Sequence, residues 1–596
     1  MTGFVFPDEF RVEKNLNSAN VDEIIGITFS ETDIDRMLTR VAERMVKAGR
    51  ISRTSKAKVG GKPADSLTVS ELAQAMQNSP ATVGFSGAAG VEALEGWLRS
   101  SVVVVKSQGK SRMGEGIDYL APITAAAYRT GFPKNAQRHR RADKIIYDLM
   151  VMFLKALDIE GPHQILKRYC AETIGQGVDF GALPHNEPNY DGKSSLDVSQ
   201  LLALRFVELF DTEGLDNKTD TEEFCGVVVP GALVPLGRDL VSLFQVMAGH
   251  VGKGATWDVA DSFSALRSVV AIRLFQIPLR TSRALRSAFS DTPHSDLWQS
   301  SIDQESDEIL RAEWKNPLEI YCDFTDVANS PSEQLAKQCV SRDLDALRLF
   351  FRDRMLYRAT IQAGSQTQSR HIFSGDSKNS KSRRAIFQEV LRAQDDTDYH
   401  NAANWYLNNL EVQLKDEHGE ATDPQSLRTL HEAREIYDNP LHAFAAVIAA
   451  SRELEGVEGL IKWLKATGGL QSAGLPKGYG VFRGREGQRS TWKYRPNEEL
   501  ILNLVDLCFI DSPNSPTKTG ATVRRKLSLG TLLARLRDRY GILVDTPPAE
   551  FDNPGTRQAA SENLRAFTGF LRDIGCFETL SDDFEGNEVL RPRRIR

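Results

Sequence analysis

The sequence predicts a mainly α-helical, multidomain protein with few short strands and a C-terminal winged-helix module. Its 596 residues exceed what one hydrophobic core supports. Apolar residues recur at helical spacing through most of the chain, and three helical patterns followed by two strand patterns close it. We therefore expect a mixed N-terminal domain at 1–160, one or more helical domains at 161–470, and a basic-aromatic segment plus winged helix at 471–596.

The composition is that of an ordinary globular protein. Hydrophobic residues make up 41% of the chain and charged residues 26%. No run approaches eighteen apolar residues, and the chain does not open on a basic-then-apolar signal pattern. The six cysteines are scattered, which disfavours a zinc finger or a disulfide scaffold. We expect a cytoplasmic protein with reduced, buried thiols and no contact with a membrane.

The N-terminal region alternates short elements with glycine-containing connections. Four valines at 102–105 predict a strand, and glycines within 81–90 predict a loop. An apolar pattern over 144–157 predicts a helix that ends before Gly161.

The middle of the chain predicts helix after helix. Amphipathic stripes recur at 340–355 and at 441–448, with polar loops at 177–195 and 364–382. The first stripe contains Val340, Leu344, Leu347, Phe351 and Met355, at spacings of four, three, four and four residues. No fixed-period repeat indicates a solenoid.

Charge is strongly segregated along the chain, although the net charge is only −6. Residues 45–64 contain six Lys and Arg and no acid, and residues 262–290 contain five arginines and no acid. Acids gather elsewhere, for example at 303–308. A mildly acidic protein with such segments can present local basic grooves to an anionic partner.

The last hundred residues predict three helices and a hairpin. The helices span about 497–509, 528–540 and 556–574, with Gly541 and Gly575 after the second and third. Two short strands at about 576–580 and 588–591 flank a polar turn. This order is typical of a winged helix, whose third helix enters the major groove and whose hairpin touches the DNA backbone.

The third of these helices carries a polar stripe beside its apolar face. Arg557, Ser561, Arg565, Thr568 and Arg572 lie roughly 100° around the helix from the apolar residues. Guanidinium and hydroxyl groups suit phosphates and base edges. The same stripe also fits a protein-docking face or a plain solvated surface.

The segment before these helices mixes cations with aromatic residues. The cations are Lys477, Arg483, Arg485, Arg489, Lys493 and Arg495, and the aromatic residues are Tyr479, Phe482, Trp492 and Tyr494. Cations neutralise phosphates and aromatic rings stack on unpaired bases. The alternative is a β-hairpin whose aromatic rings pack on a neighbouring helix.

The predicted nucleic-acid-binding residues follow from these two patterns and from a short basic run between them. They are Lys477, Arg483, Arg485, Arg489, Trp492, Lys493, Arg495, Arg524, Arg525, Lys526, Arg557, Arg565 and Arg572. The basic tail at 591–596 adds charge to the same end of the chain.

The sequence identifies no catalytic residue, metal site or cofactor. Gly109-Lys110-Ser111 follows the valine strand, but Val104 stands where a phosphate-binding loop needs glycine. The polar loop 179–191 has the residue types of a metal or acid-base site without a matching histidine pair. Asp323 and Asp326 leave a metal-dependent nuclease open as an alternative, so whether the protein is an enzyme is not decided.

The C-terminal region resembles the winged-helix ends of proteins from bacterial antiviral defence islands. The resemblance lies in the segments LSLGTLLARLRDRYGILVDTPP and ENLRAFTGFLRDIGCFETLSDDFEGNEVLRP, within about a sixth of the chain. It implies an accessory subunit, DNA-sensing or scaffolding, of a multi-gene system such as the methylation-associated type. Catalysis would then belong to other subunits.

Our functional hypothesis is a DNA-binding accessory or sensing subunit of a restriction-like antiviral complex, with DNA and other protein subunits as partners. The alternative is a helical adaptor whose winged helix docks a partner protein. A nuclease centred on Asp323 is the third hypothesis.

Overall fold

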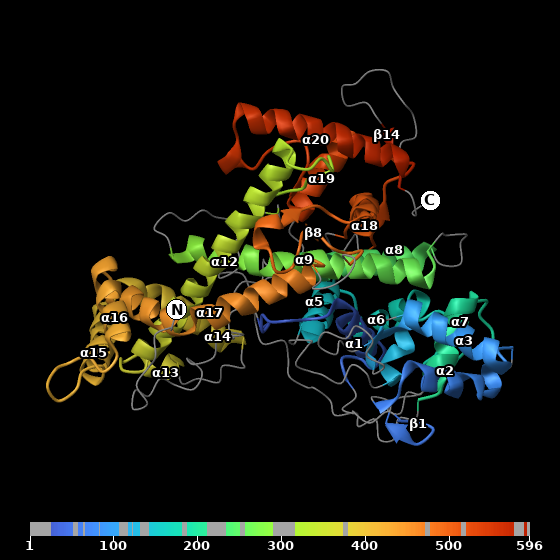
Figure 1. Ribbon diagram of the computed structural model, residues 1–596, viewed down its shortest axis with the longest axis horizontal. Coiled ribbons are helices and arrows are strands. Elements are labelled where there is room, and N and C mark those ends of the chain that lie inside the picture. The colour runs from blue at the N-terminus through green and yellow to red at the C-terminus, as the bar shows by residue number, and fades with distance from the viewer. Residues whose placement is uncertain are drawn as a thin grey trace.

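The computed structural model of the chain is mainly helical, as predicted (Figure 1). It describes residues 26–592 except 52–57, 64–65, 83, 106–116, 122, 131–141, 182–187, 211–233, 251–256, 290–315, 317, 374–379, 471–476, 514–519 and 577–588. The phosphate-loop candidate at 109–111 and most of the predicted terminal hairpin lie outside the described residues. Within the described part, no helix combines the length and the apolar character needed to cross a membrane.

Three long helices form the scaffold. They are α9 (Val259–Phe289), α12 (Pro331–Gly364) and α17 (Pro440–Thr467). Helix α12 packs on both of the others, and the stripe predicted at 340–355 lies within it. Gly456 of α17 allows the close approach, because a Cβ there would lie 2.0 Å from the ring of Phe351.

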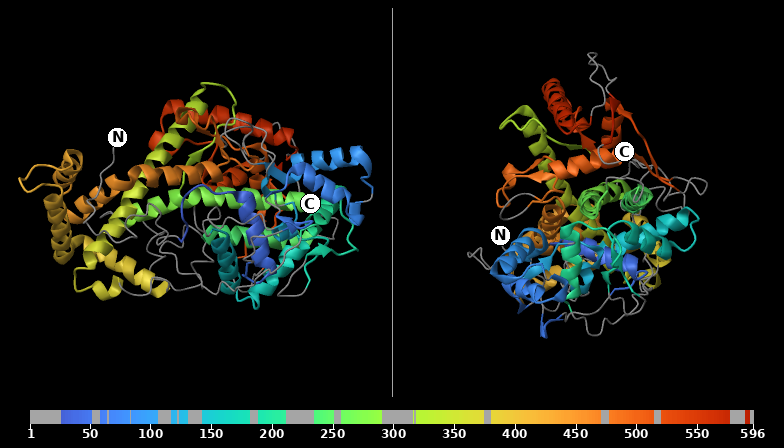
Figure 2. Two further views of the ribbon diagram at one scale, coloured as in Figure 1. Left: turned by 60° about the horizontal axis from the view of Figure 1, so that its bottom comes forward. Right: turned by 90° about the vertical axis from the view of Figure 1, so that its right-hand side faces the viewer.

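The N-terminal helices lie on one side of α9 and the C-terminal ones on the other (Figure 1, Figure 2). In the N-terminal set, α1 (Ile34–Val46) and α8 (Val234–His250) pack on α9. Helices α5 (Ala142–Ala156) and α6 (Pro162–Glu172) pack on α1 and α8. One hydrophobic core joins this set to the scaffold and to the C-terminal helices, from Ile27 to Leu590.

A smaller core lies beside the first. Its elements are β1 (Lys58–Val59), α2 (Val69–Gln77), α3 (Gly87–Trp97), β3 (Val103–Val105) and α7 (Val198–Glu208). Strand β1 pairs with β2 (Lys62–Pro63), β3 with β4 (Ile117–Leu120), and β5 (Val178–Asp179) with β6 (Asn189–Tyr190).

Most local predictions in the N-terminal region are confirmed. The strand at 102–105 is β3 and the helix at 144–157 is α5. The loop predicted over 81–90 is wrong in its second half, because α3 begins at Gly87. Gly87 has a φ of +77°, so a single glycine makes the turn and two alanines then start the helix.

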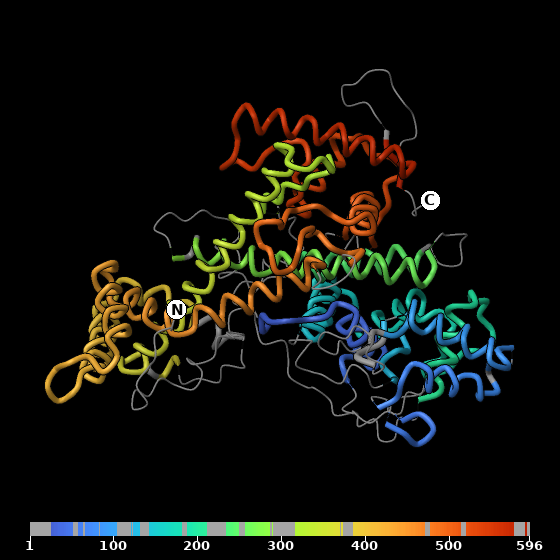
Figure 3. The backbone as a smooth tube through the Cα atoms, viewed as in Figure 1, coloured from blue at the N-terminus to red at the C-terminus, as the bar shows by residue number. Residues whose placement is uncertain are grey.

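A lobe of shorter helices occupies one end of the molecule (Figure 1). It contains α13 (Arg370–Phe373), α14 (Ser380–Arg392), α15 (Thr397–Gln413) and α16 (Pro424–Ile436). Helices α13 and α14 interrupt the region predicted as a loop at 364–382. Helix α12 enters this lobe and α17 leaves it, as the backbone trace shows (Figure 3).

The C-terminal helices fall where the sequence predicts them. They are α18 (Glu498–Cys508), α19 (Leu529–Tyr540) and α20 (Pro554–Asp573). The strands around them are β8 (Phe482–Arg483), β9 (Lys493–Tyr494), β10 (Ile510–Asp511), β11 (Thr522–Val523), β12 (Leu527–Ser528), β13 (Ile542–Leu543) and β14 (Val589–Leu590). The antiparallel pairs are β8 with β9, β10 with β11, and β12 with β14.

A parallel strand pair ties the C-terminal segment to the middle of the chain. Strand β13 pairs with β7 (Ile320–Tyr321), which precedes α12. Gly541 makes the turn from α19 into β13 with a φ of +64°, and a Cβ there would lie 2.6 Å from the Leu318 carbonyl oxygen. Asn563 of α20 is fully buried and donates to the carbonyl oxygens of Cys322 and Val544 at 2.9 and 3.0 Å.

A buried ionic cluster joins α8, α9 and α19. Asp239, which is 0% exposed, pairs with Arg273 at 2.5 Å and with Arg539 at 3.1 Å. The two guanidinium groups also donate to backbone carbonyls, Arg273 to that of Arg539 and Arg539 to those of Leu507 and Ile510. Burial acts to raise the pKa of Asp239, but the two arginines outweigh it and lower this pKa to about 2.

The acid-free arginine segment at 262–290 does not form an open basic groove. Arg267 pairs with Asp35 at 2.7 Å, Arg273 with Asp239, and Arg286 with Asp353 at 3.2 Å. Arg273 and Arg280 are only 3% exposed. The acids that pair with these arginines lie on other helices. The absence of acids from residues 262–290 therefore reflects ion pairs between packed helices and not an exposed basic surface.

We expect Asp239→Asn to lower the free energy of unfolding by about 3–5 kcal/mol, because it leaves two buried arginines without a counter-charge. The contribution of Asp239 is complete above the ordinary carboxyl pKa of 3.8 and is lost as pH falls through about 2. Urea unfolding at several pH values should show the gap to wild type narrowing in acid. Asp345→Asn, at an exposed site on α12, is the control. Equal stability of Asp239→Asn and wild type at neutral pH would contradict this role.

We also expect Asn563→Ala to destabilise the packing of α20. The substitution leaves the Phe324 amide and two carbonyl oxygens without their partner, at about 1–3 kcal/mol for each buried group. Thermal unfolding and protease sensitivity measure the effect. The neighbouring substitution Glu562→Ala, on the exposed side of α20, should leave both unchanged.

Candidate nucleic-acid interface

The basic-aromatic segment forms a hairpin whose aromatic rings face the core. Phe482 on β8 lies opposite Tyr494 on β9, and their rings stack at 5.3 Å. Both rings meet Phe275 of α9 edge-on. Tyr479 is 5% exposed. Of the two interpretations of this segment, the structure therefore matches the hairpin whose aromatic rings pack on a neighbouring helix, here α9.

Trp492 is therefore not positioned to stack on a base. Its side chain is 1% exposed, and its indole N–H donates to the carbonyl oxygen of Arg485 at 2.8 Å. The ring also packs on Phe482. Successive side chains of a strand point to opposite faces, and Trp492 and Tyr494 both point to the face that meets the core. Their rings are therefore not available at the surface.

Several cations of the hairpin are bound to carboxylates. Lys493 contacts Glu333 at 2.9 Å and Asp323 at 3.6 Å, with 14% of its side chain exposed. Arg495 pairs with Asp326. The remaining pairs are Lys477 with Asp35 at 3.6 Å and Arg489 with Glu458 at 3.0 Å.

Arg483 and Arg485 differ in exposure. Arg483 is half-buried, and its Nε has no hydrogen-bond partner. Arg485 is exposed at the turn of the hairpin. Of the six predicted cations in this segment, Arg485 and Arg489 are exposed, and Arg489 is the one of these two that pairs with a carboxylate, Glu458.

Asp323, the residue behind the nuclease hypothesis, anchors a turn. It is 0% exposed, and its Oδ1 accepts hydrogen bonds from Thr325 and Ser332. Lys493 lies beside its Oδ2. The described residues contain no group of three His, Cys, Asp or Glu side chains that could hold a metal ion. The hydrogen bonds of Asp323 thus hold the turn that leads into α12.

Glu333 shares Lys493 with Asp323. Burial acts to raise the pKa of Glu333, but the hydrogen bonds from Lys493 and the Asn329 amide outweigh burial and lower this pKa to about 2. The pair holds β9 against the first turn of α12.

The outer face of α20 matches the predicted stripe. Ala560, Phe567 and Leu571 are buried, while Arg557, Ser561, Arg565 and Arg572 are exposed and Thr568 is half-buried. Arg557 binds Asp552 through two hydrogen bonds of 2.6 and 2.7 Å at an exposed site. Glu562 and Asp573 flank the stripe.

A second exposed basic group precedes α19. Arg524, Arg525 and Lys526 lie between β11 and β12, and all three are exposed. Arg524 pairs with Asp511 at 2.6 Å. Strand β12 pairs with β14, and the Arg591 amide donates to the carbonyl oxygen of Cys576, just after α20. The chain thus connects this group to the end of α20 that carries Arg572.

We call Arg524, Arg525, Lys526, Arg557, Arg565 and Arg572 the C-terminal basic residues. They keep their side chains at the surface, whereas Trp492, Lys493 and Arg495 serve internal packing. A nucleic-acid interface built from this segment of the chain would therefore centre on α20 and the β11–β12 connection.

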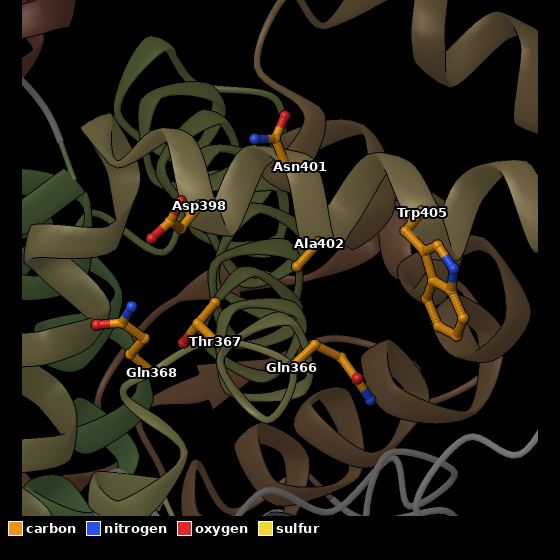
Figure 4. A pocket seen from close by; sticks show the side chains of 7 residues that line it. All are labelled: Gln366, Thr367, Gln368, Asp398, Asn401, Ala402 and Trp405. Atoms are coloured by element: carbon orange, nitrogen blue, oxygen red, sulfur yellow. The ribbon is translucent and has the colours of Figure 1, made fainter.

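Sequence reasoning missed a cavity in the lobe at the far end of the molecule. Its volume is about 440 Å³, and residues 366–368 line it together with Asp398, Asn401, Ala402 and Trp405 of α15 (Figure 4). No motif marks it. The one available signal is Trp405, an aromatic residue on the polar side of a helical pattern, where a large apolar side chain is unusual.

One comparison with known proteins gives a match. The family model described as "Methylation-associated defense system protein MAD7" matches residues 14–593, far more of the chain than the C-terminal sixth in which we noted a resemblance. Neither a curated protein nor a solved structure matches the chain.

We expect Lys493→Met to lower stability by roughly 1.5–3 kcal/mol, because it removes the charged hydrogen bond to Glu333 and the ammonium group 3.6 Å from the buried Asp323. Urea unfolding measures this. Arg485→Ala, at the exposed turn of the same hairpin, should unfold as wild type does. Unchanged stability of Lys493→Met would restore this lysine as a free surface cation.

Proposed function

Because the chain belongs to the family of methylation-associated defense system protein MAD7, we propose that it is the DNA-binding accessory or sensing subunit of such an antiviral system. The observation that carries this proposal is the exposed row of arginines on α20, held outward by the buried face of the same helix. Other subunits would supply the catalytic activities.

The connectivity of the C-terminal segment supports a winged-helix module. Strand β12 lies between α18 and α19 in the chain and pairs with β14, which follows α20. The bond from Arg591 to Cys576 brings the chain after α20 back beside β14. A winged helix has this order of helices and strands. The connection from α19 to α20 is longer than a simple turn, because it includes β13.

The electrostatics of α20 also support contact with phosphates. Arginine binds phosphate oxygens through two parallel hydrogen bonds and keeps its charge at any physiological pH. Arg565 and Arg572 are two turns apart on one exposed face, a rise of about 10 Å. The Arg557–Asp552 pair is exposed, so a phosphate can compete for this guanidinium at little cost.

The proposal predicts salt-dependent binding of duplex DNA by the full-length chain. Replacing Arg557, Arg565 and Arg572 by alanine removes up to three phosphate contacts, so the slope of log K against log salt should flatten by about two to three. We expect affinity at low salt to fall at least about tenfold. Fluorescence anisotropy with a labelled duplex at several salt concentrations measures both quantities.

The control replaces one exposed arginine on a different helix of the same protein. Arg428 on α16 is 80% exposed, and Arg428→Ala should leave DNA affinity unchanged. Equal affinity and slope for the triple variant and wild type would rule out α20 as the DNA-binding helix. Absence of DNA binding by the wild-type chain would leave protein docking as the role of this module.

A further inference from the structure

The part of the lobe that forms α15 and α16 is strongly acidic. Residues 395–438 contain eleven acids and three Lys or Arg. The acids are Asp395, Asp396, Asp398, Glu411, Asp416, Glu417, Glu420, Asp423, Glu432, Glu435 and Asp438. This segment covers α15 and α16, at the end of the molecule far from α20 (Figure 1). Its charge repels a polyanion and attracts a cationic partner.

One face of α15 lacks charge altogether. Asn401, Asn404, Trp405, Asn408 and Val412 recur at spacings of three or four residues and are all exposed. Trp405 is 52% exposed and Val412 70%. Arg434 of α16 donates a hydrogen bond to Asn408, the one hydrogen bond from a charged group to these five side chains within the described residues. Exposed tryptophans are frequent anchors of protein interfaces. We call these five residues the α15 face.

Next to the cavity, α15 is held against α12 and α17 by Tyr406. Tyr406, which follows Trp405, is buried and stacks on Phe444 of α17 at 5.3 Å. Its hydroxyl accepts hydrogen bonds from Gln362 and Gln366 at 2.9 and 3.2 Å, which fixes α15 to the end of α12. Asp398 lies at one end of the cavity and Trp405 at the other (Figure 4). A side chain that enters it meets an aromatic ring and a carboxylate.

We propose that the α15 face docks a basic amphipathic helix of a partner protein. Apolar side chains of that helix would cover Trp405 and Val412, which are seven residues and about 10 Å apart. Its Lys or Arg side chains would meet the exposed Asp398 and the excess of acid in α15 and α16. A partner helix with apolar residues at positions i and i+7 and cations beside them matches this geometry. The proposal does not depend on DNA binding by α20.

The test uses the full-length chain and a labelled helical peptide of about 18 residues, with leucines on one face and lysines elsewhere. Fluorescence anisotropy should show binding that weakens at least about tenfold in Trp405→Ser. Peptides with lysine replaced by glutamate, or leucine by serine, should not bind. Leu454→Ser, at a 72% exposed position of α17, is the matched control and should bind as wild type does.

A second arm mixes the purified chain with each other protein of the same defence system in size-exclusion chromatography. A complex that forms with wild type and is lost in Trp405→Ser, while circular dichroism is unchanged, supports the proposal. Peptide binding that is indifferent to Trp405 would overturn it. So would dimerisation of the chain that depends on Trp405, since the occupant of the face would then be a second copy.

Discussion

The structure depends on a carboxylate buried among three helices. Asp239 of α8 holds Arg273 of α9 and Arg539 of α19, and these arginines in turn bind backbone carbonyls of the C-terminal segment. A buried charge without a partner is strongly unfavourable, so these elements can pack only in the arrangement that pairs all three groups. The C-terminal segment is thereby part of the main core. The arginines of α20 lie on a helix whose inner face belongs to this core.

Charged side chains are unevenly distributed between the C-terminal segment and the lobe. Arg557, Arg565 and Arg572 lie on the exposed side of α20, while the segment at 395–438 contains eleven acids and three Lys or Arg. The small net charge of −6 does not reveal this uneven distribution of charge. The proposed contacts with DNA and with a cationic helix use different surfaces, so neither excludes the other.

Local features of the fold were predictable, whereas long-range pairing was not. The ends of α18, α19 and α20 follow from apolar spacing and from glycines such as Gly541. The partners of Arg267 and Lys493 could not be found this way, because Asp35 and Glu333 lie more than 150 residues away in sequence. The role of Trp492 was open for the same reason, since a strand pattern does not say which face meets another helix. At the candidate site, the exposed stripe of α20 was predictable because a helix facing a core has one outer side.

The path of the chain through the lobe separates the surface of the lobe from the packing of the scaffold helices. Helices α12 and α17 pack along each other, so residues 365–439 depart from the scaffold and return to it at neighbouring points (Figure 3). A segment with this topology is an insertion in architectural terms. Substitutions on its outer surface therefore leave untouched the contacts by which α12 packs on α17.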